Sequence, residues 1–263
     1  MRRAVVDGVR RAVRGARAWA AGPGALPGFL VIGGQRCGTT SLHSYLAAHP
    51  QVRAATGKEL QYFSLHYGRG ERWYRGHFPP AVPGTISFEA SPFYLFHPQA
   101  AQRAAATLPE GRFVALLRDP VERAWSHYLH TRSYGHEPLS FADAIATEPS
   151  RLATPEGLRR YSYAARGRYA EQLERWLAHV PRERLHVVRS EDLYADPAAV
   201  YAGVLSFLEL DPFTPAEFAV HTRRVDRGGP PEEVARTLRE HFTPHNARLT
   251  DLLGWPDPWP ATP

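Results

Sequence analysis

The stretch that decides the fold begins at residue 29 and reads Phe29-Leu30-Val31-Ile32-Gly33-Gly34-Gln35-Arg36-Cys37-Gly38-Thr39-Thr40-Ser41-Leu42. Its first four residues are apolar and β-prone, which predicts a short buried strand, and a helical pattern continues through Tyr45 and Leu46. A glycine-rich loop between a strand and a helix directs successive backbone N–H groups toward one point, where the helix dipole also favours an anion. The stretch therefore predicts a phosphate-binding loop. A glycine-rich turn that binds nothing is the alternative at this point.

The loop differs from that of nucleoside triphosphatases at one decisive position. After Gly38, where those enzymes carry lysine, this chain has Thr39, and the basic residue, Arg36, comes three positions earlier. In phosphoryl transfer the loop lysine reaches the terminal phosphates, and the following hydroxyl holds a magnesium ion. A sulfuryl group carries less charge than a terminal phosphoryl group, so fixed protein cations suffice for its transfer. Cys37 is interpreted as a small, inert residue that fills a tight loop.

A second candidate anion site follows the apolar run 113–117. Such a run is typical of a strand buried on both faces of a parallel sheet. It ends in Arg118-Asp119-Pro120, where Pro120 suits the first turn of a helix, and Ser126 follows about two turns into that helix. Arg118 thereby lies at the carboxyl end of a strand, where open α/β sheets bind their ligands. The alternatives are an ion pair of Arg118 with an acidic neighbour and a Ser126 hydroxyl satisfied within its own helix.

The two motifs together resemble the sulfotransferases that use 3′-phosphoadenosine 5′-phosphosulfate (PAPS). That family has a strand, a loop in which a basic residue precedes a Gly-Thr pair, and a helix, followed later by a strand that ends in Arg-Asp-Pro before a serine-bearing helix. The resemblance implies that Arg118 and Ser126 bind the 3′-phosphate. It also implies that the 5′-phosphosulfate lies against the first loop, at Arg36, Cys37, Gly38, Thr39, Thr40 and Ser41.

Arg36 would also stabilise charge on the leaving phosphate. The family usually has lysine at this position. Arginine keeps the positive charge but does not act as a proton donor, because its guanidinium does not lose a proton in proteins.

The segment from Lys58 to Phe63 resembles the Lys-Glu-x-x-x-Phe segment of the carbohydrate and heparan-type branch of the family. The glutamate is the proposed base there, so the resemblance implies that Glu59 takes the proton of an acceptor hydroxyl. A carboxylate at the start of a helix is the alternative. Where the heparan-type enzymes have Glu-Lys-(Ser/Thr), this chain has Glu89-Ala90-Ser91. Lys58 and Glu89 are candidate acceptor-binding residues, and a satisfied carboxylate at the end of a strand is the alternative for Glu89.

Two further groups are assigned by resemblance. Gly167-Arg168-Tyr169 is similar to a family segment near the nucleotide, with core packing as the alternative for Tyr169. In the family a late basic loop closes over the 3′-phosphate. The stretch of matching composition here is 222–230, and its basic residues are Arg223, Arg224 and Arg227. A solvated basic loop is the alternative for this stretch.

Composition excludes several classes of protein. The 263 residues include 32 Lys plus Arg, 26 Asp plus Glu and one cysteine, with a net charge of +6. A single cysteine cannot form an internal disulfide, and no apolar run approaches the roughly 18 residues of a membrane span. A reducing cytoplasm is the expected location. His127 and His130 lie three residues apart on a predicted helix, but no further ligands at zinc-like spacing accompany them, so no metal is expected.

The positive charge gathers in an N-terminal arm, residues 1–28, which holds six arginines and one aspartate. The rest of the chain is nearly balanced, which argues against a nucleic-acid-binding face. Valines at roughly helical spacing between the arginines favour peripheral contact with an anionic membrane or a partner, and a frayed, solvated tail is the alternative. Lys58 is the only lysine of the chain, which we interpret as high-GC codon usage in a bacterial source.

The remaining patterns predict one domain over residues 29–255 and a proline-rich tail over residues 256–263. Strand and helix candidates alternate, and the resemblance implies a three-layer α/β/α fold with a central parallel sheet and a P-loop-like phosphosulfate-binding loop. Residues 231–253 predict two helices. Loops around residues 64–84 and 131–165 are expected to shape the acceptor site.

The expected activity is in-line transfer of the sulfuryl group of PAPS to a hydroxyl of a glycan, glycolipid or secondary metabolite. With Glu59 as base, the products are a sulfate ester and adenosine 3′,5′-bisphosphate. One alternative is a P-loop kinase or NTPase with magnesium-dependent ATP binding, against which Thr39 argues. The other is a nucleotide-binding protein at a membrane surface that has lost catalysis, against which Glu59 argues.

Overall fold

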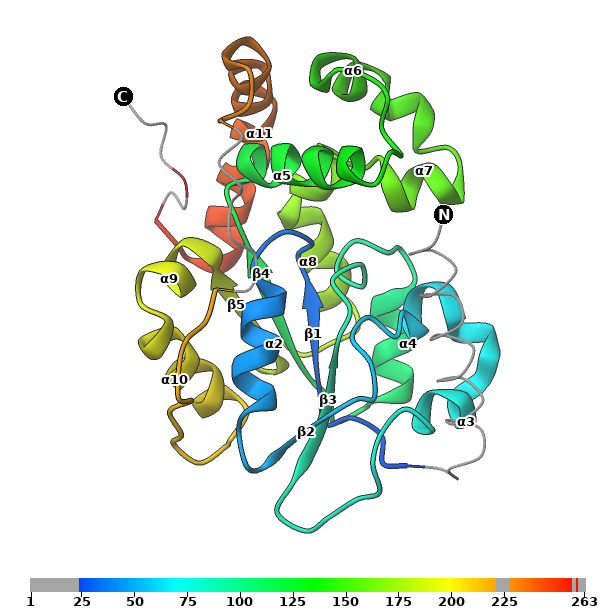
Figure 1. Ribbon diagram of the computed structural model, residues 1–263, viewed down its shortest axis with the longest axis vertical. Helices are drawn as coiled ribbons and strands as arrows, with labels where there is room; N and C mark the ends of the chain where they lie inside the picture. Colours follow the sequence, from blue (N-terminus) through cyan, green and yellow to red (C-terminus); the bar gives the residue numbers. More distant parts are fainter. Residues whose placement is uncertain (1–23, 221–227, 257–258, 260–263) are drawn as a thin grey trace.

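The computed structural model describes residues 24–220, 228–256 and 259. Its sheet has five parallel strands in the order β2-β3-β1-β4-β5. Their bounds are β1 Phe29–Gly33, β2 Val52–Ala54, β3 Ile86–Ala90, β4 Arg112–Leu117 and β5 Leu185–Arg189. Helices cover both faces, so the expected three-layer α/β/α fold with a central parallel sheet is confirmed (Figure 1).

The helices follow the strands in the alternating order that parallel pairing requires. They are α2 Thr39–Ala47, α3 Gly70–Arg75, α4 Ala100–Thr107, α5 Pro120–Ser133, α6 Phe141–Arg151, α7 Pro155–Arg160, α8 Tyr169–Leu177, α9 Ser190–Ala195, α10 Pro197–Phe207 and α11 Glu232–Leu253. Short helical turns are η1 Tyr62–His66, η2 Tyr67–Arg69, η3 Ala165–Gly167 and η4 Arg182–Arg184.

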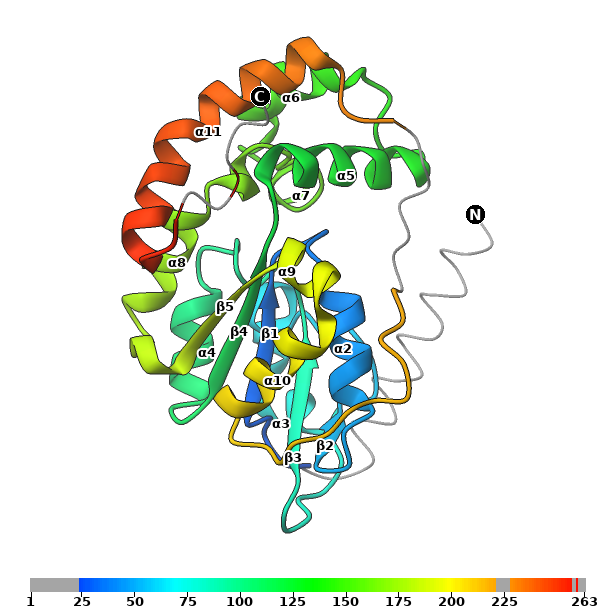
Figure 2. The same ribbon diagram turned by 90° about the vertical axis from the view of Figure 1, so that its left-hand side faces the viewer.

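The pleat of β1 distributes its apolar side chains to both layers. Phe29 and Val31 pack in a cluster with α2 and α10, whereas Leu30 and Ile32 pack in a cluster on the other face with α4 and α8. All four side chains have no exposed surface. The two layers lie on opposite sides of the sheet in Figure 2. A strand buried on both faces explains the uninterrupted apolar run in the sequence.

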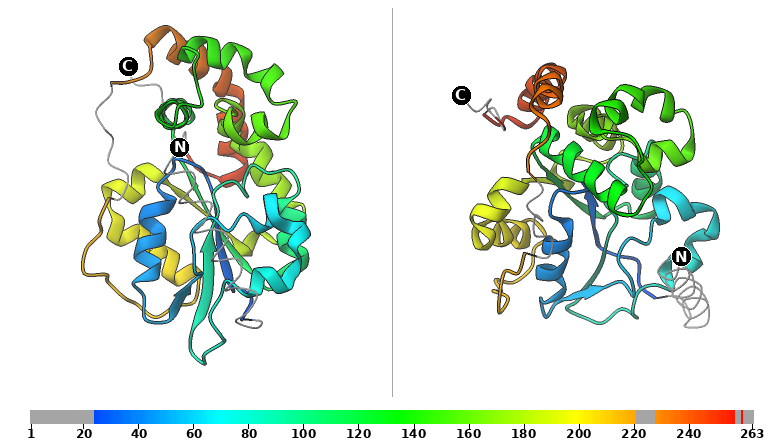
Figure 3. Two further views of the ribbon diagram at one scale, coloured as in Figure 1. Left: turned by 45° about the vertical axis from the view of Figure 1, so that its right-hand side comes forward. Right: turned by 45° about the horizontal axis from the view of Figure 1, so that its top comes forward.

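A third apolar cluster lies beyond the carboxyl ends of the strands. It joins α5, α6 and α11 through residues such as Tyr128, Phe141 and Phe242. Helix α5 crosses above the end of β1, with α6, α7 and the start of α11 outside it (Figures 1 and 3). Its first turn follows β4 directly, because Pro120 occupies the first turn and the Asp119 carboxylate accepts a hydrogen bond from the Glu122 amide at 2.8 Å.

Three details of the structure were not predicted correctly or not predicted at all. Residues 231–253 were expected to form two helices, but α11 is one helix with Pro244 inside it. β2 is a three-residue edge strand with no apolar pattern of its own. The segments expected to shape the acceptor site contain helical elements, η1, η2 and α3 in the first and α6 and α7 in the second.

Residues 24–28, just before β1, pack on the body. The Ala25 amide donates to the Pro79 carbonyl, and the Gly28 amide donates to the Ser87 carbonyl. Over the described ranges, none of the helices combines the length and the apolar character that a membrane span needs.

Candidate active site

The loop between β1 and α2 has the conformation of an anion-binding loop. Gly38, at the N-cap of α2, has φ 90°, in the left-handed region, and no side chain caps the helix. Gly38 has no side chain that could bond the amides of the first turn, and the helix dipole favours a negative charge there. The Gly34 amide anchors the other end of the loop by donating to the Leu116 carbonyl of β4 at 2.5 Å.

Arg36 and Ser126 come together at the carboxyl edge of the sheet. Arg36 Nε donates to Ser126 Oγ at 3.0 Å, which joins the phosphate loop to the second turn of α5. Burial lowers the pKa of Arg36, and the positive charge of Arg118 lowers it further. Two arginines that repel one another in a partly buried place would both be stabilised by an anion between them.

Arg118 is positioned by its surroundings at the end of β4. Its Nη2 donates to Glu122 at 3.2 Å, the ion pair that the sequence left open as an alternative. Its carbonyl accepts a hydrogen bond from the Tyr169 hydroxyl at 2.8 Å. Three of the five guanidinium N–H groups lie on nitrogens that this ion pair does not use, so the pair leaves donors for a phosphate.

Cys37 and Tyr169 lie in the core behind the loop. The Cys37 thiol lies 3.9 Å from the Tyr169 hydroxyl, and both side chains are buried. Burial raises the pKa of Cys37 to about 11, so the thiol stays protonated and unreactive. Tyr169 thus connects the back of the phosphate loop to the carbonyl of Arg118, in agreement with the core packing named above as its alternative, and its role near a nucleotide remains a prediction.

Lys58 and Glu59 reach the same edge from the segment after β2. Lys58 Nζ donates to Thr40 Oγ1 at 2.5 Å, so the only lysine of the chain contacts the first turn of α2. Burial lowers the pKa of Lys58, and the charge of Glu59 acts in the opposite direction. Glu59 is exposed, and its amide donates to the Ala90 carbonyl at the end of β3 at 3.0 Å. The base predicted by resemblance therefore lies next to a residue that contacts the phosphate loop.

Backbone strain is concentrated at these residues. Among the described residues, four other than glycine have φ in the left-handed region: Arg36, Glu59, Gln61 and Glu209. The first three belong to the two segments that meet at the candidate site. Such conformations cost on the order of 1–3 kcal/mol each and persist where the surroundings enforce them.

Glu89 stabilises the backbone of the segment that contains Lys58 and Glu59. Its carboxylate is buried and accepts hydrogen bonds from the hydroxyls of Tyr74, Tyr94 and Ser91 at 2.7–2.9 Å. The Leu60 amide, next to Glu59, also donates to it. Burial raises the pKa of Glu89, whereas these donors lower it. The geometry is that of the satisfied carboxylate named above as an alternative, and it fixes the backbone that presents Glu59.

The late basic residues Arg223, Arg224 and Arg227 lie outside the described residues. The first residue described after them, Gly228, accepts a hydrogen bond through its carbonyl from Trp125 Nε1 at 3.0 Å. Trp125 precedes Ser126 on α5, so the chain returns to the body beside one of the predicted phosphate ligands.

Sequence reasoning missed two residues at the site, Gln35 and Arg166. Arg166 precedes the segment that contains Tyr169, is 4% exposed, and donates through Nη1 to Gln35 Oε1 in the phosphate loop. Gln35 was part of the quoted loop but received no role. Its position inside the loop was the available signal, whereas nothing in the sequence indicates that Arg166 reaches it across 131 residues.

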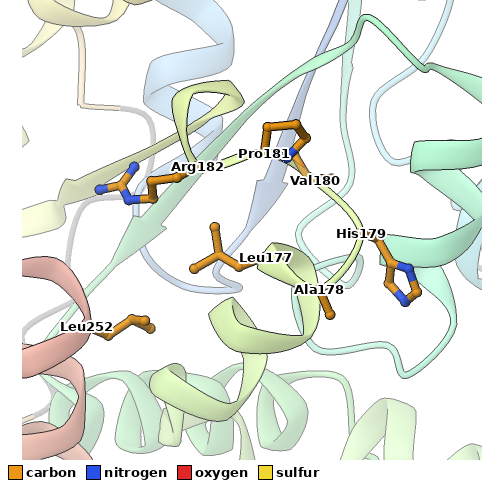
Figure 4. Close-up of a pocket in the computed structure, with 7 residues that line it drawn as sticks. All are labelled: Leu177, Ala178, His179, Val180, Pro181, Arg182 and Leu252. Atoms are coloured by element: carbon orange, nitrogen blue, oxygen red, sulfur yellow. The ribbon is translucent and has the colours of Figure 1, made fainter.

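Two open cavities in the described part of the chain do not coincide with this site. One of about 580 Å³ lies where the end of α8 leads toward β5, with Leu177, Pro181 and Leu252 on its walls (Figure 4). It is therefore at the amino end of the sheet. The other, of about 380 Å³, runs along the edge strand β5 to Trp255.

Comparisons with known proteins find that the chain is similar to sulfotransferases. A family model described as "Sulfotransferase family" matches residues 60–215. The bifunctional heparan sulfate N-deacetylase/N-sulfotransferase 3 of Homo sapiens is 35% identical over 201 residues, which cover 71% of this chain and 23% of that protein. A membrane-associated sulfotransferase of Dictyostelium discoideum is 27% identical and covers 89% of this chain and 66% of its own.

Among solved structures, a sulfotransferase from Alicyclobacillus acidocaldarius superposes with a TM-score of 0.75 at 30% identity, covering 88% of this chain and 97% of that one. The chain spans about a quarter of the length of the heparan-type relatives it matches.

Proposed function

The chain belongs to the sulfotransferase family, and from this membership we propose that it transfers the sulfuryl group of PAPS to a hydroxyl or amino group of a glycan. The observation that carries the proposal is the convergence of the two motifs at one edge of the sheet. Arg36 of the phosphate loop donates a hydrogen bond to Ser126 of α5, and the positive charge of Arg118 lowers the pKa of Arg36.

The residues present fit a doubly phosphorylated nucleotide. The backbone amides at the start of α2, with Arg36, would hold the 5′-phosphosulfate. Arg118 and Ser126 would hold the 3′-phosphate, since a guanidinium offers a planar set of donors to phosphate oxygens. Arg223, Arg224 and Arg227 remain proposed ligands of the same phosphate. PAPS would supply an activated sulfuryl group, and the chain would hold PAPS in position and balance the negative charge of its phosphates.

Glu59 is the proposed base on the acceptor side. Its carboxylate would take the proton from the acceptor as the acceptor oxygen or nitrogen forms a bond to sulfur. The bond between sulfur and the bridging phosphate oxygen breaks at the same time, and Arg36 stabilises the negative charge left on that phosphate. The names of the heparan-type relatives support a glycan acceptor and an amino group as one of its nucleophiles.

Titration with adenosine 3′,5′-bisphosphate, followed by calorimetry, tests the donor assignment. We expect binding by the wild type and an affinity at least tenfold lower in Arg118→Ala, because a hydrogen bond to a charged group contributes roughly 1.5–3 kcal/mol. Magnesium with ATP serves as the comparison ligand. Preferred binding of magnesium ATP, or unchanged bisphosphate affinity in Arg118→Ala, would contradict the proposal.

Label transfer tests the acceptor. The protein is incubated with sulfur-labelled PAPS and either heparosan, whose amino groups are acetylated, or its N-deacetylated form. Label in both glycans indicates a hydroxyl acceptor, and label only in the N-deacetylated form indicates an amino group. Labelling of neither glycan, while fractionated small molecules of the host take up label, would show that the acceptor is not a glycan of this kind.

A further inference from the structure

Gln35 lies in the phosphate loop immediately before Arg36, and its side chain is held in one orientation. Arg166 Nη1 donates to Gln35 Oε1. A guanidinium only donates hydrogen bonds, so the amide atom that faces Arg166 must be the oxygen. The two polar atoms of an amide diverge from the same carbon, and the NH2 group therefore faces away from Arg166. In the part of the chain that the structure describes, Gln35 Nε2 has no hydrogen-bond acceptor.

The planar guanidinium of Arg166 is held by hydrogen bonds at its edges and by an aromatic ring on its face. Nε donates to Ser162 Oγ at 2.7 Å, and Nη2 donates to the Arg159 carbonyl at 2.7 Å. The guanidinium lies over the ring of Phe93 at 4.7 Å. At 4% exposure its guanidinium presents little surface to a ligand. Any effect on the chemistry must therefore pass through the residue that it orients.

Gln35 is connected to both the donor side and the acceptor side of the proposed site. Its neighbour Arg36 contacts Ser126 at 3.0 Å on the donor side. On the acceptor side, burial and the charge of Arg123 lower the pKa of Arg166 to about 9, while the charges of Glu148 and Glu59 raise it. The guanidinium that holds Gln35 is therefore within electrostatic range of the proposed base. A sulfuryl group in transfer must pass between the loop and that base.

We propose that the Gln35 side-chain amide binds the oxygens of the sulfuryl group of PAPS, and that Arg166 is the positioning residue that turns the NH2 group toward them. This inference rests on the proposed function and adds a residue that binds the transferred sulfuryl group itself. It assigns Gln35 to sulfuryl oxygens and not to phosphate, because the backbone amides of α2 and Arg36 already serve the phosphate.

The test compares two nucleotides that differ only in the sulfuryl group. Calorimetry gives the affinities of PAPS and of adenosine 3′,5′-bisphosphate for the wild type and for Gln35→Met, which has similar length but no donor. We expect PAPS affinity to fall about tenfold in Gln35→Met, with bisphosphate affinity within about twofold of wild type, as loss of one charge-assisted hydrogen bond predicts. The acceptor does not enter the measurement.

Gln51→Met is the matched control, because Gln51 lies just before β2, at the other end of the sheet, and bonds to Asp211. The ratio of the two affinities should equal that of the wild type in this control. A wild-type ratio in Gln35→Met as well would overturn the assignment. If the wild type binds neither nucleotide, the proposed function itself fails, so the two failures are distinguishable.

A double-mutant cycle tests the role of Arg166. Arg166→Met should lower the PAPS affinity selectively, and adding Gln35→Met should lower it no further, because Arg166 acts through Gln35. Arg166→Lys keeps one donor and should restore part of the ratio. Equal losses for both nucleotides in Arg166→Met would show that Arg166 only maintains the fold. If that variant does not fold, Gln35→Met and Arg166→Lys still decide the question.

Discussion

At the scale of single residues, the candidate site is defined by side chains held at unusual backbone positions. Arg36 and Glu59 both have φ in the left-handed region, and each is tied to another segment. Arg36 bonds to Ser126 on α5, and Glu59 is bonded through its amide to Ala90. The Arg36 side chain and the backbone of Glu59 are thus positioned before any ligand arrives, which lowers the entropy that binding must remove.

Glu59→Gln tests the proposed base. The variant keeps the shape of the side chain and loses the ability to take a proton, so we expect turnover to fall by roughly 10²–10⁴-fold. The affinity for adenosine 3′,5′-bisphosphate should not change, since Glu59 belongs to the acceptor side. Turnover is measured as release of the bisphosphate from PAPS with the acceptor glycan present. Full turnover in the variant would remove Glu59 from the mechanism.

At the scale of elements, the turn from β1 into α2 determines where the phosphate loop can bind. Gly38 has φ 90°, and a Cβ placed on it would lie 3.0 Å from the Tyr194 hydroxyl and 3.3 Å from Leu193. A side chain is therefore disfavoured by conformation and by space. The loop, α2 and α9 meet at this glycine.

Gly38→Ala should lower the free energy of unfolding by about 1–2 kcal/mol, the cost of a Cβ in the left-handed conformation. It should also weaken bisphosphate binding, because the amides of α2 shift with the N-cap. Gly203→Ala is the matched control: Gly203 lies inside α10, and a Cβ there meets no atom within 4 Å. We expect it to stabilise the protein by about 0.5–1 kcal/mol. Urea denaturation measures both, and equal effects would contradict the argument.

The elements also show how far sequence reasoning reaches. The strands β1 and β4 were predicted because a strand buried on both faces leaves an uninterrupted apolar run, and the loop and helix after each followed from glycine and proline. β2 was not predicted, because three residues at a sheet edge carry no periodicity. The continuity of α11 was missed because packing of Phe242 and Leu249 in the core overrides the break that Pro244 predicts.

The candidate site was predictable to a similar extent. Motifs identified Arg118 at the end of β4, Arg36 in the loop after β1 and Ser126 on the helix after β4. The contacts of Lys58 with Thr40 and of Arg166 with Gln35 were beyond sequence reasoning, because each depends on how distant segments pack. The burial of Glu89 beneath the segment of Glu59 is a similar case.

At the scale of the whole molecule, the site lies between the sheet and a helical layer beyond its carboxyl edge. Helix α5 contributes Ser126 to the site and packs against α6 and α11 on its other side (Figure 3). Residues 1–23 of the N-terminal arm lie outside the described residues, and contact of the arm with an anionic membrane remains a prediction.

The pH dependence of stability is a property of the whole fold, and His43 gives a clear test. Burial, with the charge of Lys58, lowers its pKa to about 4 from the ordinary 6.5. The unfolded chain therefore binds a proton at a higher pH than the folded chain. Stability linked to this group is complete above pH 6.5 and is lost as the pH falls toward 4.

His43→Phe keeps a ring against Phe88, which lies 5.0 Å away, and removes the titration. Relative to this variant, the wild type should lose about 2 kcal/mol between pH 6.5 and pH 4 once solvent screening is allowed for. Urea denaturation at pH 8, 6.5, 5.5 and 4.5 measures the difference, which should be constant above pH 6.5. A difference that stays constant down to pH 4.5 would show that His43 titrates normally in the folded protein.

The strand order has a consequence for synthesis on the ribosome. β1 leaves the ribosome first, yet it lies in the middle of the sheet, where Phe29 pairs with Phe88 on one side and with Arg112 on the other. Its four apolar residues therefore have no strand to pair with until β3 and β4 have been synthesised, and this exposed apolar segment can make the nascent chain aggregate. We therefore expect a chaperone that recognises short apolar segments to bind the nascent chain at residues 29–32.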